Sequence, residues 1–73
     1  MSKLPSNLRW EDVANVLRKL GYTLARKRGS HALFVNEEGR MVVVVMKSPV
    51  KRGTLEAIID LTGVSREKFL ELL

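Results

Sequence analysis

The only histidine of the chain lies in a setting that suits phosphate chemistry. His31 stands in the segment "GSHALF", directly after the basic run Arg26, Lys27 and Arg28. Histidine exchanges a proton near neutral pH, and RNA carries its own nucleophile, the 2′-hydroxyl. His31 is therefore a candidate to remove that proton or to protonate the leaving 5′-oxygen, while nearby cations stabilise the charge on the phosphate. Taken alone, a lone histidine at a strand start is more often a packing or surface residue.

A second group of basic residues precedes a predicted helix. Lys47, Lys51 and Arg52 lead into Gly53-Thr54, where we expect a helix to begin with Thr54 as its cap. The free N–H groups and the positive end of the dipole at a helix N-terminus attract phosphate. We therefore expect RNA or phosphate contacts here and at Arg26, Lys27, Arg28, Gly29 and Ser30. The alternative is a basic loop that simply stays solvated.

The positive charge is concentrated in the middle of the chain. The formal net charge is +5, yet the segment from Arg18 to Arg52 carries nine basic and two acidic residues, a net of +7. The remaining residues carry a net of −2. Such a distribution favours a polyanionic partner, most simply nucleic acid, over a surface that is basic only for solubility.

Other classes of site and location are disfavoured. The chain has no cysteine and one histidine, and no carboxylates cluster near His31, so we expect no metal site. The scattered glycines form no P-loop or dinucleotide fingerprint, so no cofactor is expected. No apolar run reaches the roughly 18 residues that span a bilayer, and "MSKLPSNLRW" lacks the apolar core of a signal peptide. We therefore expect a cytoplasmic location and no membrane association.

The hydrophobic pattern predicts an α+β fold in a single domain, residues 1–73. A helix is expected over about 9–20, with Asn7 as a possible cap and Gly21 as its end. Strands are expected over 22–28, 31–36 and 40–46, with Gly29-Ser30 as a turn or the start of the second strand. A helix then ends at Gly63, and a short last helix follows the cap Ser65. The expected architecture is a three-stranded antiparallel meander with all helices on one face.

Two details of side-chain placement follow from these patterns. Strict alternation in the first strand puts Leu24, Arg26 and Arg28 on one face. The third strand, "RMVVVVM", is apolar on both faces, although a sheet with helices on one side buries only one of them. Either alternate set of its residues is therefore expected to face solvent or a partner. In the second helix we expect Leu55, Ile58, Ile59 and Leu61 to be buried.

The order and spacing of several segments resemble a known family. The segments "LRKLGYTLARKRGSHALF", "EGRMVVVV" and "KRGTLEAIIDLTGVSREKFLELL" resemble the HicA toxin family, also called YcfA-like mRNA interferases. The resemblance runs from about Leu8 to Leu73. It implies a fold like the double-stranded-RNA-binding domain, ribosome-independent cleavage of mRNA, and His31 as the catalytic residue. It also implies a HicB-like antitoxin that covers the active site.

The chain departs from the family pattern at one position. Many members carry a second histidine after the third strand, where this chain has Met46, so His31 is the only acid–base candidate. Two alternatives to an endoribonuclease therefore stay open: a non-catalytic RNA-binding module, and a protein-interaction subunit that docks through the valine strand. The free protein is expected to be a monomer, with a homodimer as a second explanation of that strand.

Overall fold

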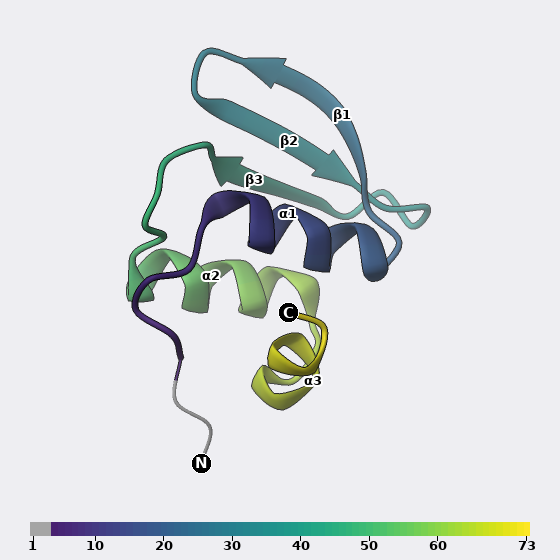
Figure 1. Ribbon diagram of the computed structural model, residues 1–73. Helices are drawn as coiled ribbons and strands as arrows, with labels where there is room; N and C mark the ends of the chain where they lie inside the picture. Colours follow the sequence, from purple (N-terminus) through teal and green to yellow (C-terminus); the bar gives the residue numbers. More distant parts are fainter. Residues whose placement is uncertain (1–3) are drawn as a thin grey trace.

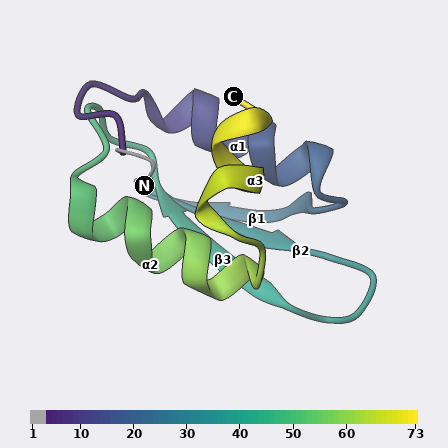
Figure 2. The same cartoon turned by 90° about the horizontal axis from the view of Figure 1, so that it is seen from below.

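The computed structural model describes residues 4–73, and its elements follow the expected order. They are α1 (Trp10–Lys19), β1 (Thr23–Arg28), β2 (His31–Val35), β3 (Met41–Val45), α2 (Arg52–Thr62) and α3 (Arg66–Glu71). The strands form one antiparallel sheet in the order β1-β2-β3. All three helices lie on the same side of this sheet (Figure 1 and Figure 2). The predicted α+β arrangement is confirmed.

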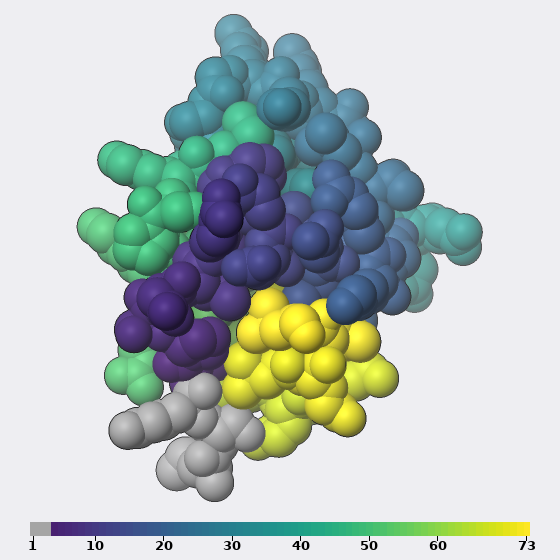
Figure 3. Space-filling view, viewed as in Figure 1, coloured from purple at the N-terminus to yellow at the C-terminus, as the bar shows by residue number. Residues whose placement is uncertain are grey.

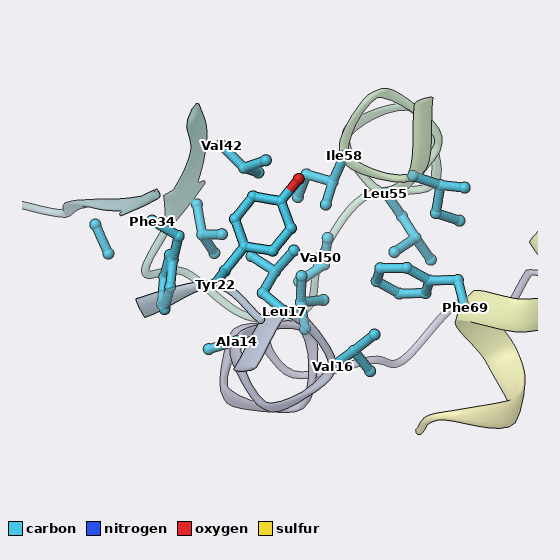
Figure 4. Close-up of a cluster of buried hydrophobic side chains, with 14 of the residues drawn as sticks. Ala14, Val16, Leu17, Tyr22, Phe34, Val42, Val50, Leu55, Ile58 and Phe69 are labelled. Atoms are coloured by element: carbon cyan, nitrogen blue, oxygen red, sulfur yellow. The ribbon is translucent and has the colours of Figure 1, made fainter. Parts of the chain in front are cut away.

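The core lies between the sheet and the helices. Ala32 and Phe34 of β2 and Val42 and Val44 of β3 are at most 1% exposed and face the helices. They belong to one buried cluster with helix side chains, among them Val16, Leu17, Leu55, Ile58 and Phe69 (Figure 4). Each large apolar side chain buried here contributes about 1.5–3 kcal/mol. The sheet thus packs on the helices through the alternate side chains of β2 and β3 that face inward.

Among residues 4–73, no layer covers the opposite face of the sheet, and part of this face is apolar. Met41, Val43 and Val45 are 60%, 48% and 37% exposed, whereas the two valines between them are buried. Of the two alternate sets in the third strand, this is the one that faces solvent. We call this uncovered side of the sheet the open face.

Two tight turns connect the strands. Arg28 pairs with His31, so Gly29 and Ser30 form a two-residue turn rather than the start of β2. Gly29 has a φ of 56°, a positive value at the first turn position, where type II′ hairpins place glycine. In the β2–β3 turn, Gly39 has a φ of 82°. There the Asn36 side-chain carbonyl accepts hydrogen bonds from the N–H groups of Glu38 (3.1 Å) and Arg40 (2.8 Å).

The expectation of strict alternation along β1 is wrong. Leu24 pairs with Phe34 while Arg26 pairs with Leu33, so Ala25 forms a β-bulge between them. An extra residue in one strand reverses the side on which the following side chains lie. Leu24 is therefore on the helix side, and Arg26 is on the open face. Every residue of β1 is exposed, so no packing enforces alternation along this strand.

Both predicted helix caps upstream of α3 are also wrong. The N-cap of α1 is Arg9, not Asn7, and its backbone N–H donates to the Asp12 carboxylate at 3.1 Å. The N-cap of α2 is Lys51, three residues before Thr54, and its carbonyl accepts from the Leu55 N–H at 2.9 Å. Neither N-cap side chain bonds the first turn. The first three residues of α2 are exposed, so water can satisfy N–H groups that a side-chain cap would otherwise bind.

The C-terminal part of the chain agrees better with expectation. Gly63 ends α2 in the left-handed conformation with a φ of 76°, and the Ser65 hydroxyl accepts from the Lys68 N–H at 3.0 Å. Leu61 is 48% exposed rather than buried. The Lys19 ammonium donates to the Leu72 carbonyl at 2.7 Å, which joins the end of α1 to the C-terminal segment. Figure 3 shows these two parts in contact, in blue and yellow.

Within residues 4–73, no helix is both long enough and apolar enough to cross a bilayer.

One buried polar atom yields a test of the core. Tyr22 is 3% exposed, and its hydroxyl points into the apolar cluster (Figure 4) without a hydrogen-bond partner among residues 4–73. Burying an unpaired hydroxyl costs about 1–3 kcal/mol. We therefore expect Tyr22→Phe to raise the free energy of unfolding by about 1 kcal/mol, measured as a higher urea midpoint at an unchanged slope.

The control for this test is Phe69→Ala. Phe69 is fully buried, so its truncation should lower stability by about 3–5 kcal/mol. A Tyr22→Phe protein that is less stable than the parent would show that the hydroxyl is hydrogen-bonded.

Candidate nucleic-acid interface

The predicted RNA-contact segments lie along one edge of the molecule. In Figure 1 the turn between β1 and β2, the end of β3, the loop that follows it and the first turn of α2 all lie at the left. The antiparallel order brings the Gly29–Ser30 turn next to the end of β3, because β2 begins where β3 ends. The two basic groups, distant in sequence, are thus brought to the same edge of the fold.

His31 lies on the open face at the centre of a row of three side chains. It pairs with Arg28 of β1 on one side and with Val45 of β3 on the other. Directly opposed residues of an antiparallel pair lie on the same face, with Cβ atoms about 4.5–5.5 Å apart. The next row along the strands is Arg26, Leu33 and Val43. His31 is exposed and is therefore accessible from the open face, with arginines beside it.

Lys27 does not share this surface. It pairs with Ala32, whose side chain is buried on the helix side of the sheet. The Lys27 side chain therefore projects on the helix side, where it remains exposed. Of the three consecutive cations predicted to contact phosphate, the structure places Arg26 and Arg28 on the face of His31 and Lys27 on the opposite face.

The turn beside His31 is attached to the loop that carries Lys47. The Ser30 carbonyl accepts a hydrogen bond from the Met46 N–H at 2.6 Å, and the Lys47 N–H donates to the Val45 carbonyl at 2.8 Å. Met46, the position at which the family resemblance implied a second histidine, is half-buried and packs against the core. These bonds fix the position of Gly29 and Ser30 relative to the start of the loop.

The same loop is also tied to the beginning of α1. The Trp10 N–H donates to the Ser48 hydroxyl at 3.1 Å, and the Val50 N–H donates to the Leu8 carbonyl at 2.8 Å. Sequence reasoning did not assign a role to Ser48, because its partner lies 38 residues away. The sequence indicated only that residues 47–52 form a loop, because Pro49 argues against continuation of the strand. The basic loop is thus held at both ends by the fold.

A hollow of about 310 Å³ opens between the end of β3 and the start of α2. Val45 forms part of its wall and is also the cross-strand neighbour of His31. Lys47 and Lys51 line it as well, together with Thr54 and Ile58 of α2. Sequence reasoning treated Thr54 as a cap and Ile58 as core, so this hollow was not predicted. It places Lys47 and Lys51 around one cavity; Arg52 does not line it.

The cations of the central segment divide into two groups. Arg18 stacks over Phe34, with its guanidinium carbon 5.7 Å from the ring centre, and Arg40 donates to the Leu61 carbonyl at 2.8 Å. With Lys19, these residues support the fold. The six predicted contact cations form no salt bridge within residues 4–73. They are Arg26, Lys27, Arg28, Lys47, Lys51 and Arg52. Their charge is therefore not neutralised by carboxylates of the described chain.

In the described part of the chain, no three histidine, aspartate or glutamate side chains gather as they would around a metal ion.

Comparison with known proteins supports one family. The family model for the HicA toxin of bacterial toxin–antitoxin systems matches residues 10–64, which run from the first residue of α1 to just beyond α2. A search of curated proteins found no significant match. The family match covers about three quarters of the 73 residues and contains His31 and all six contact cations. The chain therefore belongs to the HicA toxin family of bacterial toxin–antitoxin systems.

Proposed function

We propose that this protein is the toxin of its pair and acts as an endoribonuclease on mRNA, with His31 as the general acid or base. The observation that carries the proposal is the position of His31: exposed, opposite Arg28 on the open face, and one residue from the Gly29–Ser30 turn. The cations around it are not paired with carboxylates within residues 4–73. An imidazole beside uncompensated positive charge suits proton transfer at a phosphodiester.

The proposed reaction uses the nucleophile that RNA already carries. The 2′-oxygen forms a bond to phosphorus while the bond from phosphorus to the 5′-oxygen breaks. His31 either accepts the 2′-hydroxyl proton or donates a proton to the leaving 5′-oxygen, and water serves in the other role. The products are a 2′,3′-cyclic phosphate and a 5′-hydroxyl. Arg28 stabilises the charge that builds on the phosphoryl oxygens.

The first turn of α2 supplies a place for a neighbouring phosphate. It contains no acidic residue, and Lys51 at the N-cap forms no side-chain cap bond. Backbone N–H groups at this position favour an anion, and Lys51 and Arg52 add positive charge. RNA bound across this edge would contact Arg26 and Arg28 on the open face and Lys47, Lys51 and Arg52 at the loop. Gly29 and Ser30 allow close approach of the backbone beside His31.

A HicB-like protein is the proposed antitoxin. The family belongs to toxin–antitoxin systems, and the uncompensated cations favour an acidic partner, because complementary charge speeds docking. Such a partner would neutralise the toxin by excluding RNA from His31.

A non-catalytic RNA-binding module is the second candidate. It is favoured by one observation: the chain has a single histidine, and the position of the second family histidine is occupied by the half-buried Met46. In this case the same cations would bind RNA without cleavage.

The first test replaces His31. His31→Ala removes the proton carrier from an exposed position, so the fold should persist and cleavage should fall by about 10²- to 10⁴-fold. Cleavage is followed with a labelled RNA in the presence of EDTA, where the parent should remain active. RNA affinity, measured by fluorescence anisotropy, should change little.

His31→Gln is the matched variant, because it keeps a polar side chain of similar reach but cannot exchange a proton near neutral pH. It should be as inactive as His31→Ala. Full cleavage by either variant would exclude His31 as the acid or base, and a parent protein that binds RNA without cutting it would favour the second candidate.

The second test concerns phosphate contacts. Replacing Lys51 and Arg52 with alanine should weaken binding to all single-stranded RNA sequences alike. The slope of log K against log salt concentration should flatten by about 1.4, because each phosphate contact to a single strand contributes about 0.7.

Arg66→Ala with Lys68→Ala is the control, since it removes the same charge from α3. The ion pair of Arg66 with Glu56, at 3.6 Å, is exposed, so its loss should cost little stability. An equal change of slope in the control would mean that net charge, not the position of Lys51 and Arg52, determines RNA binding.

A further inference from the structure

The two edges of the sheet differ in how they are protected against pairing with another strand. Natural proteins blunt exposed edges with β-bulges and charged side chains. The β1 edge has both: a bulge at Ala25 and the cations Arg26, Lys27 and Arg28. The β3 edge, Met41–Val45, has neither, and consists of one methionine and four valines. The unprotected edge is therefore β3.

The hydrogen-bond pattern shows which main-chain groups are free at this edge. The Asn36 N–H donates to the Arg40 carbonyl at 3.1 Å, and the Met46 N–H donates to the Ser30 carbonyl. Bonded positions alternate in an antiparallel pair, so residues 42 and 44 also bond to β2, while the N–H groups of Met41, Val43 and Val45 point away from it. Within residues 4–73, no hydrogen bond occupies these outward groups at Met41 or Val43.

The hollow lies at the same edge. Its walls are the last residues of β3 and the facing side of α2, so a strand added to β3 would pass along its opening. Strand addition to a free edge commonly combines main-chain hydrogen bonds with a pocket for one side chain. The hollow is at the small end of the range for ligand pockets, about 300–1,000 Å³. It suits one or two apolar side chains.

The charge of the hollow indicates the chemistry of the segment that would fill it. Its lining contains Lys47 and Lys51 but no carboxylate. Neither lysine forms a salt bridge within residues 4–73. An extended segment with carboxylates beside an apolar side chain would pair with both lysines. A second copy of this chain, with a net charge of +5, supplies such a segment poorly.

We infer that the antitoxin adds an extended strand to the edge of β3, places an apolar side chain in the hollow and sets carboxylates against Lys47 and Lys51. Because these lysines are also proposed to hold RNA phosphates, the added strand and RNA compete for them; this competition, unlike the strand pairing, rests on the proposed function. The added strand then covers the loop beside the row of Arg28, His31 and Val45. Inhibition therefore does not require an antitoxin side chain to reach His31.

The experiment compares two variants at Val43. Val43→Pro removes an outward N–H without breaking the β2–β3 bonds, and proline is tolerated on edge strands. Val43→Thr keeps the N–H and the branched shape. The probe is the purified antitoxin encoded beside this chain's own gene, and affinity is measured by calorimetry. Val43→Pro should weaken binding by about tenfold or more, whereas Val43→Thr should bind nearly as the parent does.

Amide hydrogen exchange of the parent protein tests the same inference without a variant. With antitoxin bound, exchange at Met41, Val43 and Val45 should slow, while the outward amides of β1 should not change. Unchanged affinity of a folded Val43→Pro protein, or unchanged exchange along β3, would overturn the inference. Exchange along β3 that is slowed by RNA but not by antitoxin would also overturn it, and would assign the hollow to nucleic acid. Exchange that is already slow in a free homodimer would overturn it as well. If the parent protein does not cleave RNA but its β3 amides are still protected by antitoxin, the proposed function is refuted and the strand-addition inference stands.

Discussion

All three helices pack on the same face of a three-stranded sheet, and this constraint determines which side chains of β2 and β3 face inward. Only one face of the sheet has a partner layer, so a register in which Phe34 and Val42 face inward is strongly preferred. The two-residue Gly29–Ser30 turn then sets Arg28 opposite His31. A slip of one residue would bury His31 and expose Phe34. Core packing therefore fixes the orientation of the candidate catalytic side chain.

The same constraint separates two uses of positive charge. Three cations of the central segment are occupied by the fold: Arg18 lies over Phe34, and Lys19 and Arg40 bond carbonyls of the C-terminal segment and of α2. The six predicted contact cations, on both faces of β1, in the loop after β3 and at the start of α2, have no such partners among residues 4–73. The positions of these six cations therefore describe the charge that a polyanion encounters better than the net charge of +5 does.

The site itself is held together by contacts between distant segments. Hydrogen bonds join Met46 to Ser30, Trp10 to Ser48 and Val50 to Leu8. They connect the β1–β2 turn, the basic loop and the start of α1 into one edge. Because the loop is anchored at both ends, its lysines are presented from a defined position, which lowers the entropic cost of ordering them around a partner.

From the sequence alone, the α+β order, the end of α2 at Gly63 and the Ser65 cap followed correctly, because periodicity and turn chemistry are local properties. The family resemblance, which rested on the order and spacing of quoted segments, was also correct. The sequence did not predict the Ala25 bulge, the early start of α2 at Lys51–Arg52 or the exposure of Leu61. Alternation put Lys27 on the opposite face from Arg26 and Arg28, but did not tell which of these two faces His31 shares. Each depends on which neighbour lies across the sheet or beneath the helix. The hollow and the unprotected edge of β3 depend likewise on the packing of α2 beside the sheet. The tertiary structure alone decided them, because they arise between segments that the sequence keeps apart.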